Sequence, residues 1–578
     1  MGQLELRKSS AIRCGNREGR LVVVSNRVAL PSSAHTPVAG GLAVAMDAVL
    51  KARGGLWFGW SGKTCEETGA DPQCRTFGTR TYAVCDLSHR DAEQYYHGFA
   101  NRTLWPICHY RLDLADLSEC NAAAYFRVNE DFALQLHKML RQDDIIWVHD
   151  YHLIPLAGFL RQLGCANRIG FFLHIPWPGP AVASALPYYQ RLLRSFGAYD
   201  IVGFQTQVDA DNFRDCIVTA NAGLTVGGVL CEVNGRSLQA GAFPIGIDTD
   251  RFAQQARTAE KTSTCKRALA HLGSRDLIIG VDRLDYSKGL KNRLDAFATF
   301  LDRSPEAVRA HVTMLQITPK SRSEVPEYLR MQRELAEDVG RINGRFGDVD
   351  WTPILYINKS MGHAALAGLY RMSRVGLVTP LRDGMNLVAK EYVAAQAPDD
   401  PGVLVLSQFA GAAEELKSAL IINPYDIEAT ADAIARAFAM PLDERKDRWH
   451  AMMAVLRANS VHNWASSFLE ALDDEVKGGN GDSPLAEAGL PFVVGSGRQE
   501  LRRAAPWQRS LPRADTRGPL RHMPPATPRA SSEQHSATNP MHQLSKASRT
   551  PPPLCLHGSA MTTAADPAQH LNGKPPIH

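Results

Sequence analysis

Short apolar runs rich in β-branched residues alternate with longer amphipathic segments through most of this 578-residue chain. The runs have the length and composition of parallel strands that are buried on both faces. These runs are 21–24, 145–148, 169–173, 201–204, 277–281, 312–317, 375–378 and 403–406. The alternation predicts βαβ units and therefore an α/β fold with doubly wound parallel sheets.

The amphipathic segments between the runs predict helices, among them 123–140, 327–343 and 427–438. The strands fall into two groups that separate near residue 243, so we expect two doubly wound, Rossmann-like domains that face one cleft. Ligands of such sheets bind beyond the carboxyl ends of the strands. Residues that follow the predicted strands are therefore the first candidates for a site.

The composition changes near Gly478. Residues 481–578 contain 15 of the 34 prolines, two aromatic residues, 11 Lys or Arg and 6 Asp or Glu. A segment with so few large apolar side chains cannot offset its ordering entropy by burial, so we expect a disordered, basic, Pro-rich tail. The formal charge of the whole chain is only +4, which does not indicate a nucleic-acid partner. No apolar run is long enough to span a membrane.

The cysteines and the N-terminus indicate the compartment. Eleven cysteines lie scattered between Cys14 and Cys555 without any Cys-x-x-Cys pair, which is evidence against a zinc site and against a disulfide framework. The first residues lack the apolar segment of a secretory signal. We therefore expect reduced thiols and a cytoplasmic location.

Metal ligands are also sought in two Asp-x-Asp triplets, 248–250 and 348–350, and in the His and Asp residues of 149–152. Triplets of this kind are common by chance, and the sequence near 149–152 offers no further ligand at helical spacing. We expect no metal site.

Polar residues end several predicted strands and could bind a phosphorylated sugar. Arg27 follows the first strand, and Arg322 follows a strand in the second group. Two such arginines could hold a phosphorylated substrate, because guanidinium groups bind phosphate in a fixed geometry. Asp150 and His174 end two further strands. Asp150 could accept hydrogen bonds from sugar hydroxyls.

A second set of strand-end residues suits a nucleotide diphosphate. Arg283 and Lys288 lie five residues apart in a strand-to-helix loop, where two cations could clamp a diphosphate and neutralise a leaving nucleotide. The pair Gly40-Gly41 precedes a helical segment, and glycines there let backbone N–H groups approach phosphate oxygens. Asp383 lies in another strand-end turn, and Glu391 in the following helix could accept both hydroxyls of a ribose.

Taken together, these residues and their surroundings resemble the trehalose-6-phosphate synthase family. The motifs that carry the resemblance are S-N-R, A-G-G-L, L-W-F-G-W-S-G, Y-Y-x-x-F, L-W-P, W-V-H-D-Y-H-L, G-F-F-L-H-I-P, G-F-Q-T, P-I-G-I-D, D-R-L-D-Y-S-K-G, G-R-I-N-G and T-P-L-R-D-G-M-N-L-V-A-K-E-Y. They occur in order between about residues 20 and 475. Their number and length make the resemblance specific, although no single motif would.

The resemblance implies a GT-B glycosyltransferase that transfers glucose from UDP-glucose to glucose 6-phosphate, giving α,α-trehalose 6-phosphate and UDP. It implies retention of the α configuration, no metal or other cofactor, and a homo-oligomer. The weak net charge and the lack of a long apolar run lead us to expect neither a nucleic-acid nor a membrane partner. In this family the leaving phosphate oxygen is thought to accept the proton of the attacking hydroxyl on the same face of the sugar. The protein then contributes positioning and cationic stabilisation.

The grouping of the strands, the change in composition and the resemblance together predict a division of the chain. The expected parts are an N-terminal extension (1–19), an acceptor domain (20–242), a nucleotide-sugar domain (243–454), helices that cross back to the first domain (455–478), and the tail (479–578).

Roles are implied residue by residue. The residues implied to bind the acceptor are Arg27, Tyr96, Trp105, Asp150 and Arg322. Those implied to bind the donor are Gly40, Gly41, His174, Arg283, Lys288, Met361, Asp383, Asn386, Leu387, Val388 and Glu391. The catalytic residues among them are expected to be His174, Arg283, Lys288 and Asp383.

One residue departs from the family pattern, and alternatives for the function stay open. Trp177 stands where a Phe is usual, which places a bulkier ring near the donor or the domain interface.

A related transferase could use another acceptor, such as glycerol 3-phosphate, or a GDP- or ADP-linked sugar. A protein of another class, a regulator that binds the sugar phosphate without catalysis, would lack active-site residues, whereas here every matched position is filled.

Overall fold

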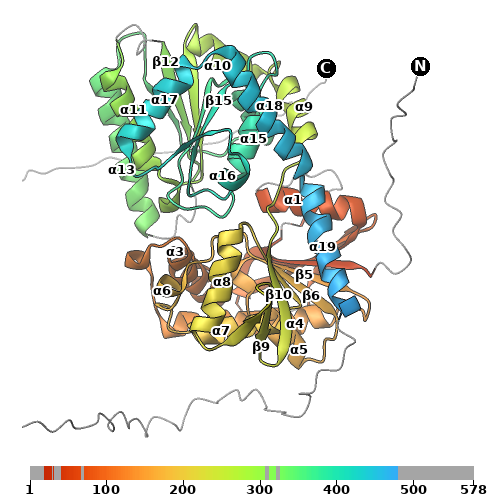
Figure 1. Ribbon diagram of the computed structural model, residues 1–578. Coiled ribbons are helices and arrows are strands. Elements are labelled where there is room, and N and C mark those ends of the chain that lie inside the picture. The colour runs from red at the N-terminus through yellow and green to blue at the C-terminus, as the bar shows by residue number, and fades with distance from the viewer. Residues whose placement is uncertain are drawn as a thin grey trace, which may run out of the picture. The chain divides into compact units, whose positions relative to one another are not determined.

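The computed structural model describes residues 19–28, 30–31, 41–66, 71–305, 311–320 and 326–478 (Figure 1). Within these residues it confirms the predicted α/β fold, because the strands form two sheets whose central strands are parallel. The predicted tail and nearly all of the predicted N-terminal extension lie outside the described residues. No helix within the described ranges has the length and apolar character needed to cross a membrane.

The first sheet contains ten strands in the order β3-β4-β2-β1-β5-β6-β7-β10-β9-β8. Their bounds are β1 (Leu21–Arg27), β2 (Gly55–Cys65), β3 (Gln73–Phe77), β4 (Arg80–Ser88), β5 (Ile145–His149), β6 (Arg168–Phe172), β7 (Ile201–Phe204), β8 (Gly223–Val226), β9 (Leu230–Val233) and β10 (Arg236–Ala242). The strands from β4 to β10 in this order are parallel, whereas β3, β9 and β8 pair antiparallel. The four strands predicted before residue 243 are β1, β5, β6 and β7.

The second sheet contains six strands in the order β13-β12-β11-β14-β15-β16, all of them parallel. Their bounds are β11 (Asp276–Val281), β12 (Val312–Ile317), β13 (Ile354–Ile357), β14 (Val375–Val378), β15 (Val403–Ser407) and β16 (Leu420–Ile422). The four strands predicted after residue 243 are β11, β12, β14 and β15. The exact domain bounds given above stay predictions.

Helices connect the strands in both sheets. The α-helices are α1 (Gly41–Arg53), α2 (His89–Asp91), α3 (Trp105–Cys108), α4 (Glu119–His137), α5 (Leu156–Gln162), α6 (Pro180–Ala183), α7 (Tyr189–Ser195), α8 (Gln207–Thr219), α9 (Thr249–Ala259), α10 (Ser263–Leu272), α11 (Leu290–Arg303), α13 (Pro326–Phe346), α14 (His363–Met372), α15 (Leu387–Ala395), α16 (Ala412–Glu415), α17 (Ile427–Ala439), α18 (Leu442–Ala458) and α19 (Val461–Gly478). A π-helix, η1 (Ala92–Leu104), and four 3₁₀ turns, η2 (Leu112–Leu114), η3 (Tyr151–Leu153), η4 (Phe196–Ala198) and η5 (Tyr286–Lys288), complete the described elements. The three predicted helices correspond to α4, α13 and α17.

The central strands of the first sheet are buried on both faces, because their side chains alternate between two apolar clusters. In β1, Val22 and Val24 belong to the cluster that contains residues of α4 and α5. Leu21 and Val23 belong to a second cluster, which contains residues of α1 and α19 and continues into α9, α14, α15 and α18. This continuous cluster joins the two halves of the chain, as the positions of α1 and α19 in Figure 1 illustrate.

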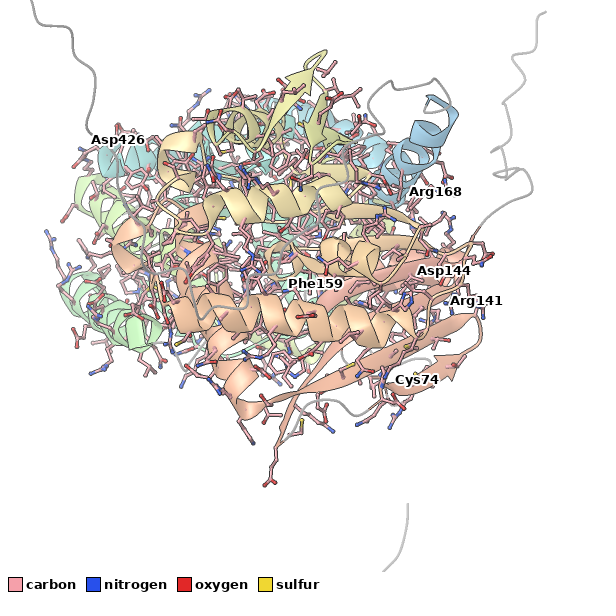
Figure 2. All side chains as sticks on the ribbon, turned by 90° about the horizontal axis from the view of Figure 1, so that it is seen from below. Cys74, Arg141, Asp144, Phe159, Arg168 and Asp426 are labelled. Carbon is pink, nitrogen blue, oxygen red and sulfur yellow. The ribbon has the colours of Figure 1, made fainter. Side chains whose placement is uncertain are left out.

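Helix α19 packs on the first sheet. The rings of Trp464 and Phe468 lie 4.9 and 4.8 Å from that of Trp147 in β5. A Cβ atom added at Gly170 in β6 would lie only 2.7 Å from the Phe468 ring, so glycine permits this close packing. Arg168, labelled in Figure 2 beside α19, donates to the Asp473 carboxylate.

Trp177 lies in the core of the first half of the chain. Its ring packs at 5.6 Å against both Phe196 and Phe213, and its indole N–H donates to Cys216 Sγ at 3.4 Å. The larger ring therefore fills a buried apolar space, which explains how a Trp is accommodated there.

We predict that Phe468→Ala lowers the free energy of unfolding by about 3–5 kcal/mol, because it opens a cavity between α19 and the first sheet. The exposed neighbour provides a matched control, since Ser467→Ala should change stability by less than about 0.5 kcal/mol. Denaturant unfolding of the two variants measures both values. Equal stability of the two variants would show that α19 contributes little to the first sheet.

Candidate active site

The loop after β11 holds Lys288 rigidly at the carboxyl end of the second sheet. Asp285 Oδ1 accepts the backbone N–H of Ser287 at 3.0 Å and caps the η5 turn. Gly289 follows at φ +61°, and a Cβ atom there would lie 2.2 Å from the Thr379 carbonyl oxygen. The position therefore requires glycine. The turn leaves Lys288 buried, with 8% of its surface exposed.

Lys288 meets Asp383 from the neighbouring strand end. Lys288 Nζ lies 2.5 Å from Asp383 Oδ2, and Asn386 Nδ2 donates to the same oxygen at 3.0 Å. Asn386 itself adopts a left-handed conformation at φ 76° and caps α15 by accepting the Ala389 N–H. Three residues predicted from two distant motifs thus form one hydrogen-bonded cluster.

A buried ion pair between Arg293 and Asp282 stabilises these loops. Arg293, which is fully buried, donates to Asp282 Oδ2 at 2.5 Å, to Thr379 Oγ1 at 3.0 Å and to Gln316 Oε1 at 3.2 Å. Burial raises the pKa of Asp282, and Arg293 partly offsets this effect. Because the partners follow or end β11, β14 and β12, one guanidinium group ties three strand ends together.

The first sheet contributes Asp150 and His174 at the ends of β5 and β6. Asp150 lies at φ 77° and ψ 164°, a conformation that residues other than glycine rarely adopt. Its carboxylate accepts the backbone N–H of His174 at 3.2 Å. The His174 ring lies between His149 Nδ1 at 3.1 Å and Gln205 Nε2 at 3.3 Å. Burial lowers the pKa of His174 to about 3, so the ring is neutral.

Arg27, the last residue of β1, and Tyr96 both pack against Trp60 of β2. The Arg27 guanidinium carbon lies 5.3 Å from the centre of the Trp60 ring, and Tyr96 packs edge-on against the same ring at 5.3 Å. A Cβ atom at Gly62 would lie 2.1 Å from Arg27 Nη2, so this glycine makes room for the guanidinium group. Tyr96 also stacks on His152 and belongs to the π-helix η1, a rare conformation that is frequent at functional sites.

The ends of the two sheets are in contact. A Cβ atom at Gly384, next to Asp383, would lie 2.2 Å from the carbonyl oxygen of His174. The Arg283 guanidinium carbon lies 5.8 Å from the centre of the Trp105 ring. Residues predicted to bind the donor and residues predicted to bind the acceptor therefore lie at one junction.

The other predicted donor residues lie along α15 and beside β13. Leu387 and Val388 form the first turn of α15, whose N–H groups are available to an anion. Glu391 follows in the same helix, and burial raises the pKa of its carboxyl group to about 7. Met361 lies half-buried between β13 and α14 and packs on the second apolar cluster.

Two predicted residues, Gly40 and Arg322, lie outside the described residues, and Gly41 is the first residue of α1. Their expected roles stay predictions.

Sequence reasoning assigned no role to His149 and Gln205, although the structure places both against the His174 ring. Both occur in motifs that carry the resemblance, and both stand at or just after the end of an apolar strand. The rule that singled out Arg27 and Asp150, a polar residue at a strand end, would have found them.

Comparison with known proteins gives a family and several relatives. The family model of glycosyltransferase family 20 matches residues 19–474. Trehalose-6-phosphate synthase of Sinorhizobium fredii is 56% identical over 455 residues, which cover 78% of this chain and 98% of that protein.

Two solved structures are similar as well. A UDP-forming α,α-trehalose-phosphate synthase from Burkholderia xenovorans in complex with glucose 6-phosphate is 50% identical with a TM-score of 0.76, covering 79% of this chain and 100% of that one. A structure from E. coli bound with UDP-2-fluoro glucose is 45% identical with a TM-score of 0.75, covering 78% of this chain and 99% of that one.

The raised pKa of Glu391 generates a prediction for stability. A buried carboxyl group that ionises later in the folded protein than in the unfolded chain destabilises the fold as the pH rises. We expect Glu391→Gln to be more stable than the original protein at pH 8, with the difference growing from about pH 4.5 to about pH 7. The free energy of unfolding of both proteins, measured between pH 4 and pH 8, tests this prediction. A stability difference that does not depend on pH would contradict the ionisation of Glu391 as its cause.

Proposed function

Because the chain belongs to glycosyltransferase family 20, we propose that it transfers glucose from UDP-glucose to glucose 6-phosphate, giving α,α-trehalose 6-phosphate and UDP. The observation that carries this proposal is the Lys288–Asp383 pair, which is joined to His174 of the first sheet by the close approach at Gly384. The relatives bound to glucose 6-phosphate and to UDP-2-fluoro glucose support both substrates.

We propose that the first sheet binds the acceptor. Arg27 would hold its phosphate, with Arg322 from the second half of the chain as the second cation. Tyr96 and Trp105 would line the sugar, and the Asp150 carboxylate would accept its hydroxyls. The support is geometric, since Arg27 and Tyr96 share the Trp60 ring as a neighbour.

We propose that the second sheet binds the donor together with residues of the first half of the chain. Arg283 and Lys288 would contact the diphosphate, helped by the N–H groups of Asn386–Val388 and by Gly40-Gly41. The ionised Glu391 carboxylate would accept both ribose hydroxyls, and Met361 would lie near the base. His174 and Asp383 would contact the donor glucose.

The mechanism we propose relies on positioning and on cations. The Asp383 carboxylate is held by Lys288 and Asn386, and that of Asp150 by a backbone N–H, so each is oriented as a hydrogen-bond acceptor. The leaving phosphate oxygen would take the proton of the attacking hydroxyl as the C–O bond breaks. Arg283 and Lys288 would stabilise the negative charge that develops on that phosphate.

A cytoplasmic location and a homo-oligomeric state also stay proposals. They rest on the scattered cysteines and on the family resemblance respectively.

The direct test is UDP release from UDP-glucose with and without glucose 6-phosphate, in the presence of EDTA. We expect release that requires glucose 6-phosphate and persists in the chelator. Parallel reactions with glycerol 3-phosphate, and with ADP- and GDP-glucose, test the alternative substrates. UDP-glucose binding without release with any acceptor would favour a non-catalytic regulator.

The role of Lys288 makes a second prediction. Lys288→Ala should lower kcat by about 100-fold or more, because the lost cation stabilises charge mainly in the transition state. The KM for glucose 6-phosphate should change by no more than a few-fold. Lys291→Ala is the matched control, since that exposed lysine pairs with Asp338 on the surface of α11 and α13. Unchanged turnover in Lys288→Ala would refute the assignment.

A further inference from the structure

Ile245, in the linker between β10 and α9, is bound by one side chain from each half of the chain. Its backbone N–H donates to Gln205 Oε1 at 3.1 Å, and its carbonyl oxygen accepts from Lys390 Nζ at 2.7 Å. Gln205 directly follows β7 of the first sheet, whereas Lys390 lies in α15 of the second. All three residues are buried, with 3% exposure or less.

The Gln205 side chain connects this linker to His174. Because the amide oxygen of Gln205 accepts the Ile245 N–H, its amide nitrogen faces His174 Nδ1 at 3.3 Å and donates to it. The proton of the neutral His174 ring then lies on Nε2, which donates to His149 Nδ1 at 3.1 Å. The orientation and the tautomer of His174 are thus set from the linker.

The Lys390 side chain connects the same linker to the second sheet. Lys390 Nζ also lies 2.5 Å from Glu415 Oε2, and Glu415 Oε1 accepts from Asn459 Nδ2 at 2.8 Å. Asn459 lies in the bend between α18 and α19. A Cβ atom at Gly246 would lie 1.9 Å from the Asn459 carbonyl oxygen, so the two connections between the halves of the chain touch here.

We propose that Lys390 and Gln205 are positioning residues for the transfer reaction. They hold the donor helix α15 and the His174 ring in one relative geometry through the two backbone groups of Ile245. This inference rests on the proposed function, in which α15 and His174 bind the same nucleotide sugar. A buried ion pair is by itself weak evidence for stability. The position of Lys390, between a donor helix and both connections, instead indicates a role in geometry.

The test is a double-mutant cycle of Lys390→Met and Gln205→Met. Each single variant should lower kcat/KM for UDP-glucose by about 10- to 100-fold, because small displacements of reacting groups cost this much. The double variant should be hardly worse than the poorer single variant, since both changes break one chain of hydrogen bonds. Lys390→Met removes the cation that pairs with Glu415. If that variant protein does not fold, Lys390→Met/Glu415→Gln replaces it in the cycle.

Arg445→Met is the matched control. Arg445 is a buried cation whose partners are Asp400 and the Pro401 carbonyl oxygen, near the amino end of β15 and away from the candidate site. Arg445→Met should lower Tm without changing kcat/KM. The double variant Arg445→Met/Gln205→Met should therefore have the same kcat/KM as Gln205→Met alone.

Three results decide the proposal. Effects of Lys390→Met and Gln205→Met that simply multiply would overturn it, and so would a lower Tm with unchanged kcat/KM. Calorimetric affinities of the same proteins for UDP-glucose separate it from the proposed function. If the original protein releases no UDP with glucose 6-phosphate while these affinities are non-additive, the proposed acceptor is wrong and the positioning role stands.

Discussion

The contact between Gly384 and the backbone of His174 sets how the ends of the two sheets meet. A side chain at position 384 would collide with the His174 carbonyl oxygen, so this closeness is possible only with glycine. The neighbouring Asp383 and its partner Lys288 consequently lie close to the first sheet. Asp150 completes the junction, because its carboxylate accepts the His174 N–H. Its backbone is strained, which is a local cost that functional sites often carry.

The electrostatics of this junction suit a reaction without a protein nucleophile. Burial keeps the His174 ring neutral, and Lys288 forms an ion pair with the carboxylate of Asp383. A bound diphosphate would offer Lys288 a second anionic partner at little cost in reorganisation, since the lysine is already buried and oriented. This arrangement of charges fits the proposed stabilisation of a leaving phosphate.

The sequence predicted the eight apolar strands because both faces of each are buried, which leaves a continuous apolar signal. It did not predict the β8–β9–β10 hairpins, in which exposed side chains interrupt the apolar signal. It also did not predict the π-helix η1. The same apolar runs located the site residues, because Arg27, Lys288 and Asp383 lie at or just beyond the ends of the predicted strands. The end of β7 also marks Gln205, but the hydrogen bonds of Gln205 and Lys390 to Ile245 could not be predicted from strand ends, because Ile245 lies 40 and 145 residues away from them.

Helix α15 shows how one short element can serve binding and positioning together. Successive residues of an α-helix point about 100° apart, so the neighbours Lys390 and Glu391 face different surroundings. Lys390 points to the linker and Glu415, whereas Glu391 would face the ribose. The N-terminal turn is capped by Asn386, and its N–H groups are those proposed to contact the diphosphate. Any movement of the linker at Ile245 would therefore displace the groups proposed for ribose and for phosphate as a single rigid unit, because they share one helix.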